Sequence, residues 1–234
     1  MSENRTMTKQ ADDAVTASLV TLGALTAAAA IVVAFVLGVA RWQSPASVDD
    51  GVRSISDGHY SSAVRTLLAA VAQAPADARA HYYLGLAYAH LGVQTGAISQ
   101  FQDAVRLVPR EPKFHAGLGR AYREVGDRPA ARGELEEAVR LDPDEPRYQI
   151  GLAGILLDDG QGAAAIVRLR RAARLRPRAA EVHLLLATVL DRAGDRSATV
   201  QEYDETRRLA GEGPLGEIAH QALRAAGSRE RSVQ

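Results

Sequence analysis

The apolar positions of this chain follow two patterns, which change near residue 41. Residues 14–40 carry no charged side chain over 27 positions, and most of them are aliphatic or small. Further along, large apolar side chains recur three or four positions apart, as at Leu84 and Tyr88, which places them on one face of a helix. The sequence therefore predicts an all-α protein with one long apolar helix followed by a series of amphipathic helices.

The second pattern repeats every 34 residues without an insertion. Leu84, Gly85, Tyr88, Gly92, Ala97, Phe101, Ala104 and Pro109 recur one step later as Leu118, Gly119, Tyr122, Gly126, Ala131, Leu135, Ala138 and Pro143. Glycines such as Gly92 suit the left-handed residue that ends a first helix, and small residues such as Ala97 allow two helices to cross closely. Each unit is thus predicted to be a pair of helices, with units that start at residues 44, 78, 112, 146 and 180.

These positions resemble the tetratricopeptide repeat, although His81, His115, Gln149 and His183 replace the aromatic residue that opens the family pattern. The resemblance covers about residues 44–213 and implies a right-handed α-solenoid of about five helix pairs. Because a stacked pair cannot bury its last apolar face alone, residues 214–227 are predicted to form a capping helix through Leu215, Ile218, Ala219 and Leu223. Gly227 is expected to end that helix, and residues 228–234 are expected to be a disordered tail.

The resemblance also implies a groove formed by one face of the first helices, in which such proteins bind other proteins. Its expected partner-binding residues are Arg79, Tyr82, Leu86, Lys113, Arg120, Arg123, Arg147, Ile150 and Leu184. The clamp that binds a terminal carboxylate in chaperone-binding members is missing, since its lysine position holds Tyr82, Ala116, Ile150 or Leu184. A segment with apolar anchors and some acidic character fits this groove better.

Residues 14–41 are predicted to be a transmembrane anchor that follows a polar tail at residues 1–13. About 20 apolar residues suffice to cross the hydrocarbon of a bilayer, and Trp42 stands where an interfacial aromatic residue is common. The alternative is a cleaved signal peptide, whose apolar region is normally shorter. Small residues at Ala30, Ala34 and Gly38 give this helix a face that can pack closely against another helix. The expected location is a bacterial inner membrane, with the repeats outside the cytoplasm rather than inside it.

Little in the sequence indicates catalysis or a cofactor. The chain has no cysteine, its 28 basic and 28 acidic side chains balance, and it lacks the phosphate-binding and metalloprotease motifs. His81, His115 and His183 occupy one position of three different units, so they are too far apart to share a metal. Glu134, Glu136 and Glu137 are interpreted as a solvated helix face. The sequence therefore predicts no enzyme, no metal, no cofactor, no nucleic-acid partner and no small-molecule substrate.

Two functions remain open from the sequence alone. The first is a membrane-anchored adaptor or scaffold whose groove binds a protein segment and supports the assembly of a membrane-associated complex. The second is a permanent accessory subunit of a larger membrane complex, held mainly through its transmembrane helix.

Overall fold

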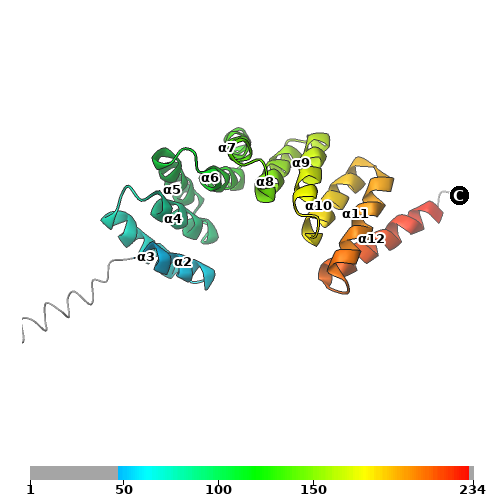
Figure 1. The fold of residues 1–234 in the computed structure, drawn as a ribbon, viewed down its shortest axis with the longest axis horizontal. Coiled ribbons are helices and arrows are strands. Elements are labelled where there is room, and N and C mark those ends of the chain that lie inside the picture. Colours follow the sequence, from blue (N-terminus) through cyan, green and yellow to red (C-terminus); the bar gives the residue numbers. More distant parts are fainter. Residues whose placement is uncertain (1–46, 232–234) are drawn as a thin grey trace, which may run out of the picture. The chain divides into compact units, whose positions relative to one another are not determined.

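The computed structural model describes residues 47–231, with side chains through Ala225, and this part of the chain is entirely helical. Ten of its eleven helices form five successive antiparallel pairs, and the eleventh covers the last pair (Figure 1). They are α2 (Val48–Ser56), α3 (Tyr60–Gln73), α4 (Ala78–His90), α5 (Gln94–Leu107), α6 (Pro112–Glu124), α7 (Arg128–Leu141), α8 (Pro146–Asp158), α9 (Gly162–Leu175), α10 (Ala180–Ala193), α11 (Arg196–Ala210) and α12 (Pro214–Arg231). The all-α solenoid expected from the sequence is confirmed for these residues.

The two helices of each pair cross closely because the positions between them are small. A β-carbon at Gly85 would lie 2.8 Å from the Phe101 ring, and one at Gly119 would lie 2.8 Å from Leu135 Cγ. Gly92, Gly126, Gly160 and Gly194 have φ angles of 75°, 82°, 73° and 81°, the left-handed conformation that ends a first helix. Side chains of Asp127 and Asp195 then accept hydrogen bonds from the first turns of α7 and α11.

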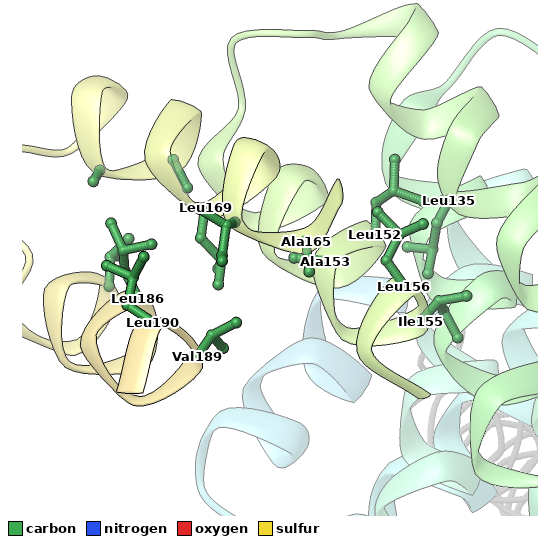
Figure 2. Close-up of a cluster of buried hydrophobic side chains, with 14 of the residues drawn as sticks. Leu135, Leu152, Ala153, Ile155, Leu156, Ala165, Leu169, Leu186, Val189 and Leu190 are labelled. Carbon is green, nitrogen blue, oxygen red and sulfur yellow. The ribbon is translucent and has the colours of Figure 1, made fainter. Parts of the chain in front are cut away.

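Successive units share one apolar core. In the largest cluster, leucines of α7, α8, α9 and α10 pack across three units, with Leu135, Leu169 and Leu186 almost inaccessible to solvent (Figure 2). The first helices α4 and α6 contact each other directly, as do α6 and α8. No two consecutive second helices of the described chain are in such contact, so the first helices line the tighter side of the stack.

The helix that covers the last pair differs from the sequence-based expectation in two ways. It continues through Arg231 rather than ending at Gly227, because one glycine inside a helix costs only about 1 kcal/mol relative to alanine. Residues 228–231 are therefore helical, and residues 232–234 lie outside the described residues. Ile218 is half exposed at 50%, whereas Ala219 is fully buried and Leu223 packs beside it.

The predicted membrane anchor at residues 14–41 lies outside the described residues, as do Ala30, Ala34, Gly38 and the tail at residues 1–13. Within residues 47–231, no helix combines the length and the apolar character that a membrane span needs. The first unit begins at Val48 with a nine-residue helix, shorter than the first helices that follow it.

Candidate protein-binding groove

A pocket of about 490 Å³ opens between the first helices α4, α6 and α8. Seven of the nine groove residues expected from the sequence line it: Tyr82, Leu86, Lys113, Arg120, Arg123, Arg147 and Ile150. A smaller pocket of about 230 Å³ shares Leu86 and Arg120 with it and reaches α5 at Gln94. We call these two pockets together the groove.

The other two expected residues lie elsewhere. Arg79 donates a hydrogen bond to Asp49 of α2 over 3.1 Å. Leu184 packs beside the cluster of Ala187, Tyr203 and Ala219 near the end of the chain. Its helix, α10, has no direct contact with α8 of the kind that joins α6 to α8, so the groove spans units two to four.

Tyr82 belongs to the packing of the molecule as well as to the groove wall. Its ring lies 5.7 Å from the Phe101 ring and 5.1 Å from the Phe114 ring, measured between centroids. Burial raises the pKa of Tyr82 above its usual value, since the charged phenolate is poorly solvated there. Replacement of Tyr82 by Ala therefore removes contacts with these two rings and should lower the stability of the fold.

Most basic side chains of the groove already have acidic partners. Arg123 donates to both carboxylate oxygens of Asp158 at 2.6 Å and 3.3 Å, and this hydrogen bond raises the pKa of Arg123 and lowers that of Asp158. Arg147 bonds Glu145 at 2.8 Å, and Lys113 lies 3.6 Å from Glu111.

Arg120 differs from these side chains. Among the described residues it forms no ion pair, although it lines both pockets of the groove. It lies beside the half-buried apolar side chains of Leu86 and Ile150. Because a guanidinium keeps its charge at any physiological pH, Arg120 offers the groove an unpaired cation on an apolar background.

Two aromatic side chains of the groove were not identified from the sequence. Tyr83 lines the pocket beside Tyr82, and Tyr148 lines it from α8. Tyr148 is 8% exposed, and burial raises its pKa to about 12. Its place in the repeat, equivalent to buried Phe114, identifies it as a packing residue. From the sequence, this equivalence is the signal that Tyr148 offered, and it predicts a buried packing residue rather than a groove residue.

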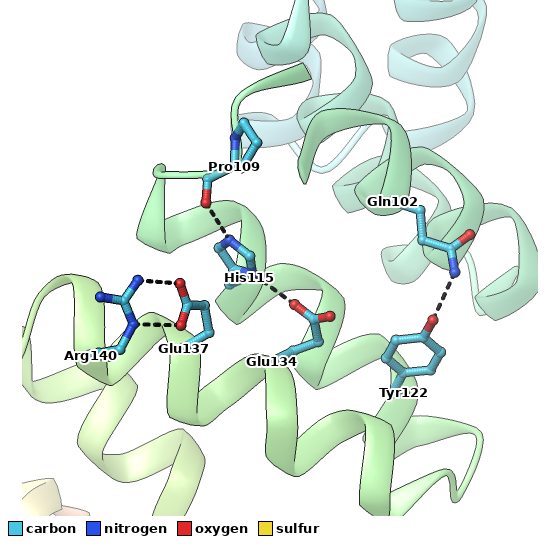
Figure 3. Close-up of polar contacts among 7 residues, drawn as sticks. All are labelled: Gln102, Pro109, His115, Tyr122, Glu134, Glu137 and Arg140. Atoms are coloured by element: carbon cyan, nitrogen blue, oxygen red, sulfur yellow. Dashed lines mark hydrogen bonds and ion pairs between the residues drawn. The ribbon is translucent and has the colours of Figure 1, made fainter. Parts of the chain in front are cut away.

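The four side chains that replace the family's aromatic residue share one structural role. Each donates to the carbonyl of the proline in the turn before its own helix, with nitrogen-to-oxygen distances of 3.0 Å for His81, 2.8 Å for His115, 2.9 Å for Gln149 and 3.2 Å for His183. Figure 3 shows His115 between Pro109 and Glu134. Within residues 47–225, no cluster of potential metal ligands is present. These hydrogen bonds tie the first helix of each unit to the turn that precedes it.

The glutamates of α7 do not form one solvated face. Glu134 lies 2.7 Å from the Nδ1 atom of His115, so it is part of the contact between the two helices. Glu136 pairs with Arg132, and Glu137 pairs with Arg140 (Figure 3). The expectation of an open face is therefore wrong for Glu134, because the packing of α6 on α7 brings a hydrogen-bonding ring to that position.

The repeats are recognised by comparison with known proteins. The family model described as "Tetratricopeptide repeat" matches residues 55–112 and 117–168. No match was found among curated proteins.

Several solved structures share the fold. The PilF protein of Pseudomonas aeruginosa is 19% identical with a TM-score of 0.66, covering 80% of this chain and 89% of that one. A thermophilic TPR protein of Thermus thermophilus is 22% identical with a TM-score of 0.63, covering 77% and 98%. YrrB, described as a TPR protein with an unusual peptide-binding site, is 16% identical with a TM-score of 0.59, covering 74% and 90%. Residues 55–112 and 117–168 therefore match the tetratricopeptide repeat model, and the described part of the chain shares the helical fold of these solved structures.

Proposed function

We propose that this protein is a membrane-anchored adaptor whose groove binds a segment of another protein. The observation that carries the proposal is Arg120, a cation without an ion pair among the described residues that lines a groove together with apolar and aromatic side chains. Hot spots of protein interfaces are rich in arginine and tyrosine that are enclosed by apolar contacts. The groove offers such a centre, whereas the basic residues around it are neutralised within the chain.

The groove favours a partner segment with apolar side chains around one acidic group. Leu86 and Ile150 provide apolar contacts on either side of Arg120, and a carboxylate can accept two parallel hydrogen bonds from its guanidinium. The smaller pocket adds a further requirement. The buried Oε1 atom of Gln94 has no hydrogen-bond partner among the described residues, so a donor from the partner segment would remove the cost of leaving it unpaired.

The anchoring part of the proposal rests on the sequence. The 27 uncharged positions at residues 14–40 are enough for one membrane-spanning helix and exceed the usual apolar region of a signal peptide. We place the protein in a bacterial inner membrane, with the repeats outside the cytoplasm and supporting the assembly of a membrane-associated complex. The other candidate is a permanent subunit of such a complex, held through the small-residue face at Ala30, Ala34 and Gly38.

The test is recovery of partners in mild detergent with the variant Arg120→Glu. Loss of a central contact worth more than about 1.4 kcal/mol lowers affinity about tenfold, so recovery of an adaptor's partner should fall by that factor. Arg65→Glu is the matched control, since Arg65 is exposed, lies on α3 away from the groove and has no ion pair among the described residues. Tyr82→Phe tests the hydroxyl without removing the ring from the core.

Two outcomes separate the candidates. Undiminished recovery with a folded Arg120→Glu variant would remove the groove from the proposed function. Loss of recovery when Ala30, Ala34 and Gly38 are all changed to Leu, with Arg120→Glu silent, would favour the permanent subunit.

A further inference from the structure

The second helix of unit four carries the opposite charge pattern to its neighbours. At three equivalent positions, α7 has Glu134, Glu136 and Glu137, α9 has Arg168, Arg170 and Arg171, and α11 has Glu202, Asp204 and Glu205. Helices α7 and α11 each contain three arginines and three acidic residues, whereas α9 contains four arginines and no acidic residue. Arg176 and Arg178 follow α9 directly, and no acidic residue occurs between Asp159 and Glu181.

This charge is only partly neutralised by the rest of the molecule. Arg171 bonds Asp144 at 2.9 Å and the Pro143 carbonyl at 3.2 Å, so it belongs to the internal structure. Arg170 lies 3.9 Å from Asp195, at the limit of an ion pair. Within residues 47–225, Arg168 and Arg174 have no ion pair, whereas Arg140 and Arg208, which are equivalent to Arg174, pair with Glu137 and Glu205.

The exposed side of α9 combines these arginines with an apolar residue. Leu169, Ala172 and Ala173 of this helix are buried in the core, so the opposite face points to solvent. Val167, Arg170 and Arg174 follow one another on that face at intervals of three and four residues. Val167 is 61% exposed, more than any other large hydrophobic side chain of the described chain. We call Val167, Arg170 and Arg174 the basic strip.

We propose that the basic strip of α9 is a second docking surface, separate from the groove, for an acidic protein segment that carries an apolar side chain beside two carboxylates. Guanidinium groups bind carboxylates through two parallel hydrogen bonds, and one helical turn separates Arg170 from Arg174. A segment that lies along α9 can therefore pair two carboxylates while an apolar side chain covers Val167.

The surroundings favour a narrow segment over a broad polyanion. Glu136 of α7 and Asp204 of α11 stand at the positions equivalent to Arg170, and each is already paired with an arginine of its own helix. A membrane surface or a nucleic acid extending over several units would meet these carboxylates on both sides of the strip. Membrane-binding helices also carry Trp, Phe or Leu on their apolar side, and α9 exposes a single large apolar residue, Val167.

The test measures binding of a fluorescent acidic peptide, three repeats of the sequence EELE, to the purified full chain in detergent at low ionic strength. Reversal of two arginines, Arg170→Glu with Arg174→Glu, should lower affinity about tenfold or more, because attractive pairs become repulsive. The control pair Arg65→Glu with Arg110→Glu changes the net charge by the same amount at exposed arginines that have no ion pair among the described residues and lie in earlier units, and it should leave binding within about twofold. The same peptide with Gln in place of Glu should not bind.

Further arms distinguish the other occupants. Circular dichroism must show that the reversed variant is folded. Arg170→Lys with Arg174→Lys keeps the charge but loses the paired hydrogen bonds, so it should bind less tightly than the wild type and more tightly than the reversed variant. Equal loss of binding in the control pair would show a general charge effect and overturn the proposal. Loss on Arg120→Glu instead would assign the peptide to the groove. Displacement of the peptide by soluble dihexanoyl phosphatidylglycerol or by a short DNA duplex at concentrations that match the peptide's own affinity would assign the strip to lipid or nucleic acid.

Discussion

Units three and four, residues 112–145 and 146–179, have the same packing and different chemistry. Ala131 and Ala165 occupy equivalent buried positions, as do Leu135 and Leu169. At other equivalent positions the two units differ: Phe114 and Tyr148, His115 and Gln149, Glu124 and Asp158, Glu134 and Arg168. The repeat thus fixes the small and large residues at which two helices cross, and it allows exchange at other positions, including the buried pairs Phe114 and Tyr148 and His115 and Gln149. Binding specificity can therefore change from unit to unit while the stack stays the same.

The largest expected effect tests whether the buried positions of units three and four are equivalent. Ala131→Arg and Ala165→Arg each force a long charged side chain into a fully buried crossing of two helices. Each should lower the free energy of unfolding by about 3 kcal/mol or more, since overpacking and an unpaired charge add together. Urea unfolding measures this effect. Glu136→Arg, which gives unit three the residue that unit four has at Arg170, is the control and should change stability by about 0.5 kcal/mol or less.

The second prediction concerns the polar contact between Glu134 and His115, which joins the two helices of unit three. Glu134→Arg places a cation against the Nδ1 atom of His115 and should lower stability by about 1–2 kcal/mol. Adding His115→Gln reproduces the combination that unit four has at Gln149 and Arg168, so the double variant should recover part of the loss. A double-mutant cycle checks the coupling. Simple additivity of the two single changes would contradict the contact.

The third prediction concerns alkaline pH. The pKa of Tyr148 is raised to about 12 by burial, against about 10 in an unfolded chain. A raised pKa means that the stability from neutral Tyr148 is complete below pH 10 and is lost as the pH rises toward 12. Tyr148→Phe, which gives unit four the residue of unit three, should make the chain more stable than the wild type by about 1 kcal/mol near pH 11, with little difference at pH 8. Identical alkaline unfolding curves would show that Tyr148 is not buried as described.

The smallest expected effect compares two carboxylates at equivalent positions, Asp158 of unit four and Glu124 of unit three. Arg123 holds the pKa of Asp158 below its usual value, so this pair stabilises the fold above about pH 4 and the contribution is lost as the pH falls through the lowered pKa. Both side chains are partly exposed, and Asp158→Asn should therefore cost only about 0.5 kcal/mol at neutral pH. Glu124→Gln, at the equivalent position in unit three, should cost nothing measurable, because Glu124 has no ion pair within the described chain.

The sequence predicted the described fold because the repeat encodes it at small and large positions. Gly85 and Gly119 report close helix crossings, and Gly126 reports a left-handed helix end. The sequence predicted side-chain contacts less well where the two residues do not occupy equivalent positions of the repeat. The pairing of Arg123 with Asp158 links two units across 35 positions, and the tilted contact of the Tyr82 ring with the Phe114 ring depends on the angle between α4 and α6. The helical spacing within one unit contains neither of these distances. The sequence therefore assigned Arg123 and Tyr82 to the surface of the groove without the residues that they contact.

The hydrogen bond from each unit's first helix to its preceding turn has a mechanical consequence. His115 and Gln149 each hold the carbonyl of Pro109 or Pro143, so the turn between two units is fastened to the unit that follows it. A pulling force along the chain therefore cannot straighten these turns without first breaking that bond. From unit two onward, the second helix of one unit and the first helix of the next contact each other less extensively than the two helices of a pair do. Under a pulling force the stack should bend at these contacts between units, while the turn before each unit stays intact.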